Sequence, residues 1–273
     1  FSNNIIYTGA APNQNSVQLA DFMMSTFGGR VYLVGSDYIY PYESNRIMSD
    51  LVTQRPGGSV VAQRYVALDS GERDFDSIVS EIRELQPDFI FSTVVGNATQ
   101  HLYRAYAEAG LNPKKMPVAS LTTSEVEVAQ MGPQAAAGHF TAAPYFASID
   151  TPENLRVLER FRKRFGDDVR PNACWEAAFF QVHMFANAFR ACGTDLVPVL
   201  MPELLGAEFL APQGRVRIEP TNHHTHLFPR IGRVNSQGGF SIVRASNNPV
   251  MPDPYLVTHS LGDWTLALDE LQD

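Results

Sequence analysis

The sequence predicts an α/β fold built on parallel sheets and divided into two lobes. Three observations support this prediction. Short apolar runs alternate with stretches of helical periodicity through the first half of the chain. These runs contain few polar interruptions, as is typical of parallel strands that are covered on both faces. The length of 273 residues exceeds that of an ordinary open-sheet unit and suits two lobes.

The first half of the chain alternates strictly between strand and helix. Because ligands bind beyond the carboxyl ends of parallel strands, we expect any site to lie where these strands end. Strands are expected at 5–10, 30–36, 59–68, 87–96, 116–123 and 138–146. Helical periodicity separates them at 16–28, 42–54, 75–85, 98–110 and 124–132.

The second half changes character. The stretch 151–166 is amphipathic and begins with a Thr-Pro pair that is typical of a helix start. The stretch 173–193 is apolar over much of a helical circumference, which predicts deep packing. A further helix and its exit are expected at 198–214, strands with an "NSQGG" hairpin turn within 214–246, and one more strand at 253–260. The chain should cross between lobes near 146–152 and again near 205–215.

The composition and the motifs exclude several functions. A net charge of −8, with a single short basic cluster on a predicted helix, argues against direct binding of nucleic acid. The chain contains no GxGxxG, GxxxxGK[ST] or GxSxG motif, and no apolar run long enough for a membrane span. We therefore expect no enzyme activity, no catalytic residue and no cofactor.

Three histidines in "NHHTHL" are the best metal candidates in the sequence. His224 and His226 would share one face of a strand, which is a workable ligand geometry. The segment follows a turn, has no cysteine and has few carboxylates near it. We therefore expect a polar turn with surface histidines, and no metal.

The stretch "VYLVGSDYIYPYESN" (31–45) holds the best binding candidates. Tyr38 and Tyr40 follow a buried strand, and in an extended segment residues two apart point to the same side. Thr122, at another strand end, adds a hydroxyl that both donates and accepts hydrogen bonds. A neutral, aromatic-walled pocket of this kind suits an amide or urea. The alternative is that both tyrosines simply pack under a helix.

The chain also resembles a known family over nearly its whole length. The matching stretches are "YTGAAPNQNS" (7–16), "VGSDYIYPYESN" (34–45), "FSTVVGNAT" (91–99), "ASLTTSE" (119–125), "APYFASIDTPEN" (143–154), "WEAAF" (175–179), "APQGRVRIEPTNHH" (211–224) and "DPYLVTHSLGDW" (253–264). They are similar to the type I periplasmic-binding-protein superfamily, and within it to the amide/urea-binding branch. That branch includes amide-responsive amidase regulators and the urea or short-chain-amide binding proteins of ABC transporters.

The resemblance implies a non-enzymatic amide receptor with a two-lobed type I fold, in which Tyr38, Tyr40 and Thr122 contact the ligand. Its partners would be a small amide or urea and either an ABC permease or an antiterminator-type regulatory protein. A branched-chain amino acid as the ligand and an amidohydrolase remain weaker alternatives, and a homodimer is an open one. The location would be periplasmic if a signal peptide precedes Phe1, and otherwise cytoplasmic.

Family members begin with roughly a hundred more residues, so the resemblance implies that the first lobe is truncated at its N-terminus. We assign 7–145 and 214–250 to the second lobe, 146–213 to the remainder of the first lobe, and 251–273 to a C-terminal tail. An incomplete lobe should expose the apolar face of the helix at 173–193.

Overall fold

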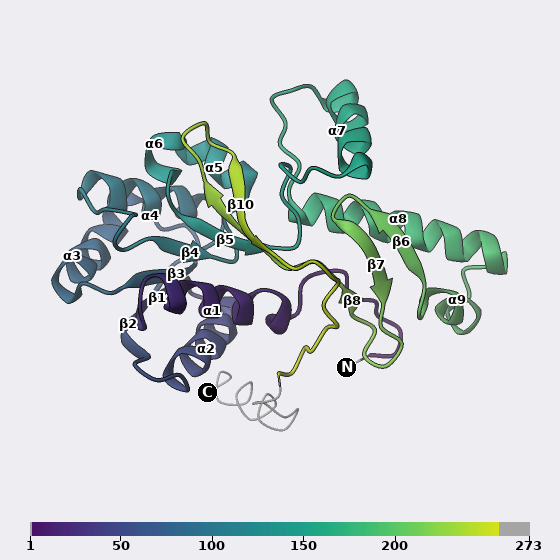
Figure 1. Cartoon of the computed structure of the whole chain (residues 1–273), viewed down its shortest axis with the longest axis horizontal. Coiled ribbons are helices and arrows are strands. Elements are labelled where there is room, and N and C mark those ends of the chain that lie inside the picture. The colour runs from purple at the N-terminus through teal and green to yellow at the C-terminus, as the bar shows by residue number, and fades with distance from the viewer. Residues whose placement is uncertain (1, 257–273) are drawn as a thin grey trace.

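The computed structural model describes residues 2–256, which form a larger and a smaller body (Figure 1). The larger body contains a seven-stranded sheet in the order β10-β9-β5-β4-β3-β1-β2. Its parallel strands are β1 (Arg30–Ser36), β2 (Ser59–Val66), β3 (Phe89–Thr93), β4 (Val118–Ser120) and β5 (Phe140–Ala143). The antiparallel pair β9 (Arg230–Val234) and β10 (Phe240–Ala245) completes one edge. The predicted α/β fold with a mostly parallel sheet is therefore confirmed.

Helices cover both faces of this sheet. On one face, α1 (Ser16–Thr26) and α2 (Ile39–Thr53) pack their apolar side chains against β1, β3 and β5. The other face is covered by α3 (Asp76–Leu85), α4 (Asn97–Glu108), α5 (Glu125–Met131) and α6 (Pro133–Ala136). Two short 3-10 helices, η1 (Pro12–Gln14) and η2 (Glu72–Phe75), precede α1 and α3.

The smaller body spans 152–227. It contains α7 (Pro152–Phe165), α8 (Ala173–Cys192) and α9 (Val197–Leu204). Its antiparallel sheet has the order β6-β7-β8, formed by β6 (Glu208–Ala211), β7 (Gly214–Ile218) and β8 (Thr225–His226). Figure 1 shows α7 above the long α8, with the small sheet packed beside α8, and Phe161 of α7 packs against Trp175 of α8.

Several element predictions need correction. The expected strand at 5–10 is only an isolated bridge between Tyr7 and His224, because this segment runs between the bodies. The helix expected at 42–54 begins earlier, at Ile39. Within 198–214, the prediction missed β6, which begins at Glu208 after the end of α9 at Leu204. Residues 253–256 form no strand, and the rest of the strand expected at 253–260 lies outside the described residues.

The lobe limits set out above remain a prediction. In the structure, β6 and β7 pair as a hairpin across the proposed limit at 213/214. The strands on either side of that limit therefore belong to one small sheet, and β9 is the first later strand to join the larger sheet.

The helix α8 buries far less of its surface than its composition predicts. Only a narrow stripe of residues spaced four apart is buried, namely Glu176, Phe180, Met184 and Ala188. Val182, Phe185 and Phe189 are exposed at 66%, 46% and 42%. Deep packing of this helix was thus a wrong prediction, whereas the predicted exposure of its apolar face is confirmed.

Gly35 allows α2 to approach the end of β1. A Cβ atom at this position would lie 2.6 Å from Thr93 Oγ1 and 2.7 Å from Pro41 Cβ. Gly35→Ala should therefore force α2 away from the sheet and lower the free energy of unfolding by about 1–3 kcal/mol, as overpacking does. Urea denaturation measures this change. Gly71→Ala is the matched control, since nothing lies within 4 Å of a Cβ there, and equal losses in the two variants would contradict the steric explanation.

Candidate functional site

Tyr38 and Tyr40 lie where β1 gives way to α2. Tyr38 is the extended N-cap residue of α2, and Tyr40 lies in the first helical turn. Their ring centroids are 6.2 Å apart. The two rings therefore lie close together, as expected, but not for the predicted reason, because Tyr40 is helical and not part of an extended segment.

Thr122 lies in the turn that follows β4. Its Oγ1 donates to the carbonyl oxygen of Val94 at 2.8 Å and lies 3.2 Å from Ser120 Oγ. These bonds fix the hydroxyl at the strand ends. Its oxygen keeps a lone pair with which it can accept a further hydrogen bond.

Tyr40 and Thr122 line one cleft of about 350 Å³ between the two bodies. The cleft lies where β3, β4 and β5 end and where α8 begins. This is the location that the topology of a parallel sheet predicts for a ligand site. Tyr38 is not among the lining residues and reaches the cleft only through its contact with Tyr40. The full lining is Tyr40, Val95, Gly96, Leu121, Thr122, Thr123, Ser124, Glu125, Glu127, Thr141, Ala143, Tyr145, Phe146, Asn172, Ala173 and Cys174.

A hydrogen bond connects the two walls of this cleft. Asn172 Nδ2, from the smaller body, donates to Ser124 Oγ of the larger body at 3.1 Å. Each of these residues also caps a helix, since Asn172 accepts from the Trp175 N–H and Ser124 from the Val126 N–H. The starts of α8 and α5 are thus held against each other across the junction.

The described cleft lining is acidic and contains no lysine or arginine. Glu127 accepts the Ser124 N–H at 2.8 Å and completes the cap of α5. Glu125 is only 7% exposed, and burial raises the pKa of its carboxyl to about 7. Desolvation likewise raises the pKa of Tyr40 to about 12, although the residue is 38% exposed, so its hydroxyl stays protonated and can donate. The lining therefore offers hydroxyls and carboxyls to a ligand.

Sequence reasoning missed Asn172, Cys174 and Tyr145. The first two come from the smaller body, some fifty residues after Thr122, and no periodic pattern links the two segments. Tyr145 lies in the connection that follows β5, and its hydroxyl donates to Asn154 Oδ1. Glu125 and Glu127 lie in the first turn of α5.

The predicted polar turn with surface histidines needs correction, because His223 is only 7% exposed and His226 lies on β8. His226 Nε2 lies 2.9 Å from Glu219 Oε2, and the ring of His224 stacks on Tyr7 at 4.2 Å. Within residues 2–256 no group of three or more potential ligands is placed to hold a metal ion. Over the same residues, none of the helices combines the length and apolar character that a bilayer crossing requires.

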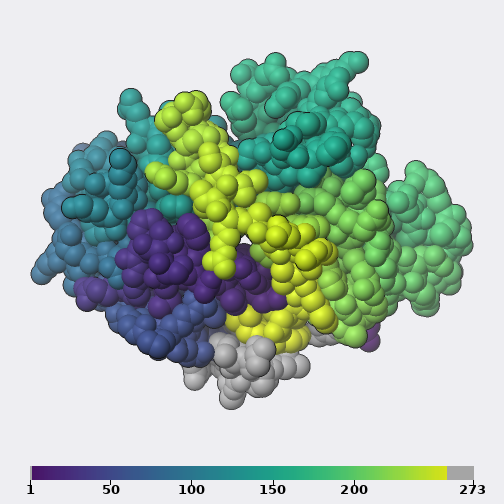
Figure 2. All heavy atoms as spheres, in the orientation of Figure 1, coloured from purple at the N-terminus to yellow at the C-terminus, as the bar shows by residue number. Residues whose placement is uncertain are grey.

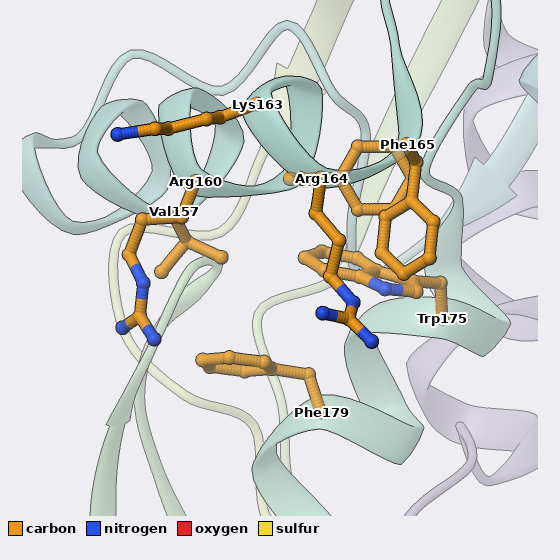
Figure 3. A pocket seen from close by; sticks show the side chains of 8 residues that line it. Val157, Arg160, Lys163, Arg164, Phe165, Trp175 and Phe179 are labelled. Atoms are coloured by element: carbon orange, nitrogen blue, oxygen red, sulfur yellow. The ribbon is translucent and has the colours of Figure 1, made fainter.

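A larger cavity of about 740 Å³ lies between α7 and α8 (Figure 3). Figure 3 shows Trp175 and Phe179 of α8 facing Arg160, Arg164 and Phe165 of α7. This groove is lined only by residues of α7 and α8, and its charges are the exposed basic side chains of α7. We therefore take the smaller cleft, which joins both bodies at the strand ends, as the candidate site.

A family model described as "Periplasmic binding protein domain" matches residues 1–261. A Leu/Ile/Val-binding protein homolog from Brucella melitensis is 24% identical over 224 residues, which are 81% of this chain and 56% of that protein. A limonene hydroxylase from Geobacillus stearothermophilus is 32% identical over 133 residues, 49% of this chain but only 24% of that protein.

Among solved structures, a solute-binding protein of an ABC transporter from R. palustris, in complex with 4-hydroxybenzoate, superposes with a TM-score of 0.82 at 23% identity. The match covers 93% of this chain and 70% of that one. At this identity the likeness shows the fold alone, and it agrees with a two-lobed α/β binding-protein fold. The chain spans about half the length of the Brucella relative.

Proposed function

The chain belongs to the periplasmic binding protein family, and from this premise we propose that it forms most of a receptor that binds a small polar solute in the cleft between its two bodies. A binding domain of this family is not an enzyme. The supporting observation is the cleft itself, which gathers Tyr40 and Thr122 from separate strand ends and faces the start of α8. Closure of the bodies on a ligand would be favoured by the ligand's higher affinity for the closed state.

We propose a neutral amide or urea as the solute. A carboxylate ligand calls for arginine, lysine or free backbone N–H groups, and the described lining supplies neither of these cations. The carboxyls of Glu125 and Glu127 would also repel a carboxylate ligand. Hydroxyls and carboxyls instead suit the N–H and C=O groups of an amide. The names of similar proteins mention benzoates and branched-chain amino acids, so 4-hydroxybenzoate and leucine are the competing ligands to test.

The partner that recognises the closed state would be an ABC permease, and the protein would lie in the periplasm. The family, and the transporter proteins that share the fold, support this proposal. An antiterminator-type regulatory protein is the alternative partner, with the chain acting as a cytoplasmic negative regulator of amidase expression. A signal peptide encoded before Phe1 would favour the permease.

Calorimetric titration of the protein, in the full length that its gene encodes, tests the ligand and the tyrosines together. Acetamide or urea should bind, and Tyr38→Ala/Tyr40→Ala should weaken binding about 30-fold. This estimate assumes one lost hydrogen bond and one lost ring contact, together worth about 2 kcal/mol. Tyr42→Ala is the matched control, because its ring packs on Tyr65 instead and its hydroxyl donates to Asp37.

Two results would count against the proposal. Binding of leucine or 4-hydroxybenzoate without any amide or urea binding would exclude the proposed ligand class. Amide binding that both variants retain equally would place the ligand away from the tyrosine pair.

A further inference from the structure

Among the described residues, the hydroxyl of Thr141 is a buried polar group for which the fold supplies no hydrogen-bond partner. Thr141 lies on β5 beside Ser120 of β4, which itself lies beside Ser92 of β3. These residues form a buried polar row across the sheet near the strand ends. Ser92 Oγ accepts the Val94 N–H, and Ser120 Oγ accepts the N–H groups that follow it in the β4 turn.

Thr141 differs from the other two members of this row. It is 3% exposed, and its Oγ1 has no hydrogen-bond partner among residues 2–256. Leaving a hydroxyl buried without a partner is unfavourable, so such groups in native proteins call for an explanation. Thr141 lines the cleft. A solute that reaches this wall of the cleft could therefore supply the missing bond.

Glu125 lies on the neighbouring wall of the same cleft. Its Oε1 accepts the Ala147 N–H at 2.7 Å, which ties α5 to the connection between the two bodies. A carboxyl has about four lone-pair sites on its two oxygens, so that of Glu125 can accept a further donor beside the Ala147 N–H. The carboxyl is buried, and above about pH 7, where it ionises, it can only accept hydrogen bonds.

We propose that Thr141 and Glu125 form an inner subsite of the cleft that holds the amide or urea group of the solute. An amide carries N–H donors next to a carbonyl acceptor. Glu125 accepts from the N–H groups, and the Thr141 hydroxyl, which can donate or accept, completes the set. The same carboxyl repels a carboxylate. This inference rests on the proposed function and adds two specificity-determining residues to it.

The first test removes the hydroxyl while keeping the shape of the side chain. Thr141→Val should weaken acetamide binding to the full-length protein about tenfold in calorimetry, while the melting temperature of the ligand-free protein is unchanged or higher. Thr141→Ser, which keeps the hydroxyl, should bind within about twofold of wild type. Tenfold corresponds to one hydrogen bond.

Thr225→Val is the matched control. Thr225 is fully buried in the smaller sheet, and its hydroxyl donates to the Tyr7 carbonyl at 2.9 Å. This variant should melt earlier yet bind acetamide normally, which is the reverse of the Thr141→Val behaviour. If Thr141→Val melts earlier and binds normally, its hydroxyl has a structural role and the subsite is overturned.

The second test changes the class of ligand that the subsite favours. Glu125→Gln keeps an oxygen for the Ala147 N–H and replaces the second oxygen with an NH2 group. At pH 8 acetamide binding should fall about tenfold, whereas any binding of 4-hydroxybenzoate should not fall. Unchanged acetamide binding would overturn the role of Glu125.

Different results would overturn the proposed function and the subsite. Wild-type protein that binds neither acetamide nor urea overturns the proposed function, and the subsite with it. If wild type binds acetamide and the variants Thr141→Val and Glu125→Gln bind it equally tightly, the subsite alone is overturned.

Discussion

Replacing Arg230 with methionine should lower the free energy of unfolding by about 3–5 kcal/mol, the usual cost of breaking a buried charged network on one side. Arg230 is 9% exposed. Its guanidinium donates to the carbonyl oxygens of Pro144, Phe228 and Gln213, which belong to three separate segments at the junction of the two bodies. Methionine fills the space but leaves these three acceptors without the donor.

The network continues from Gln213 to Glu176, which is fully buried on α8. Gln213 donates to Glu176 through its backbone N–H and through Nε2, the latter at 2.8 Å. Burial lowers the pKa of Arg230 to about 10 and raises that of Glu176 to about 7, so each charge is tolerated partly because of the other. Loss of the guanidinium therefore also destabilises the ionised form of Glu176.

Urea denaturation followed by circular dichroism measures this effect. Because Glu176 is neutral in the folded protein at acidic pH, the loss in Arg230→Met should be larger at pH 8 than at pH 5. Arg233→Met is the matched control, since Arg233 lies three residues along the same strand and is exposed. Similar losses in both variants, or a loss that does not depend on pH, would rule out the network.

The second large effect concerns His139, a buried histidine that stays neutral. Its Nδ1 accepts the Val118 N–H at 2.9 Å, and its ring packs edge-on against Tyr103 and Tyr106. Burial lowers its pKa to about 3. The unfolded chain takes up a proton on this ring near pH 6.5, whereas the folded chain does so only near pH 3. His139 therefore makes stability fall as the pH falls through that window.

Comparison of wild type with His139→Gln isolates this contribution. The buried carboxyls of Glu125 and Glu176 act in the opposite direction, because their raised pKa values make stability increase as the pH falls from about 7 toward 4.5. They are present in both proteins and cancel in the difference. Between pH 4 and 6 the wild-type advantage should shrink by about 1.4 kcal/mol per unit of acidification. A difference that stays constant across this range would show that His139 titrates normally.

The sequence was a good guide to the larger body because its signals are local. Alternating apolar runs and helical periodicity located β1 and α4 within a few residues, and "NSQGG" marked the β9–β10 turn correctly. The helix α2 begins at Ile39, three residues before its predicted start, and Pro41 lies in its first turn. Proline fits the first turn of a helix, where its missing N–H costs nothing.

The candidate site was only half visible in the sequence for a different reason. Tyr40 and Thr122 follow strands, and parallel strand ends meet at one edge of a sheet. Asn172, Glu125 and Thr141 become part of the cleft through contacts between segments that are far apart in the chain. Whether a hydroxyl such as that of Thr141 finds a partner depends on the packing around it, and no spacing in the sequence reports that.

The chain passes several times between the two bodies, and this has a consequence for biosynthesis. Tyr7 pairs with His224, and Gln14 Nε2 donates to the carbonyls of Thr225 and Val250, more than two hundred residues later. Figure 2 shows the last described segment, in yellow, lying across the junction. Contacts so distant along the chain form slowly. We expect Tyr7 and Gln14 to be synthesised more than two hundred residues before their partners in 224–250, an interval in which chaperones can bind this segment.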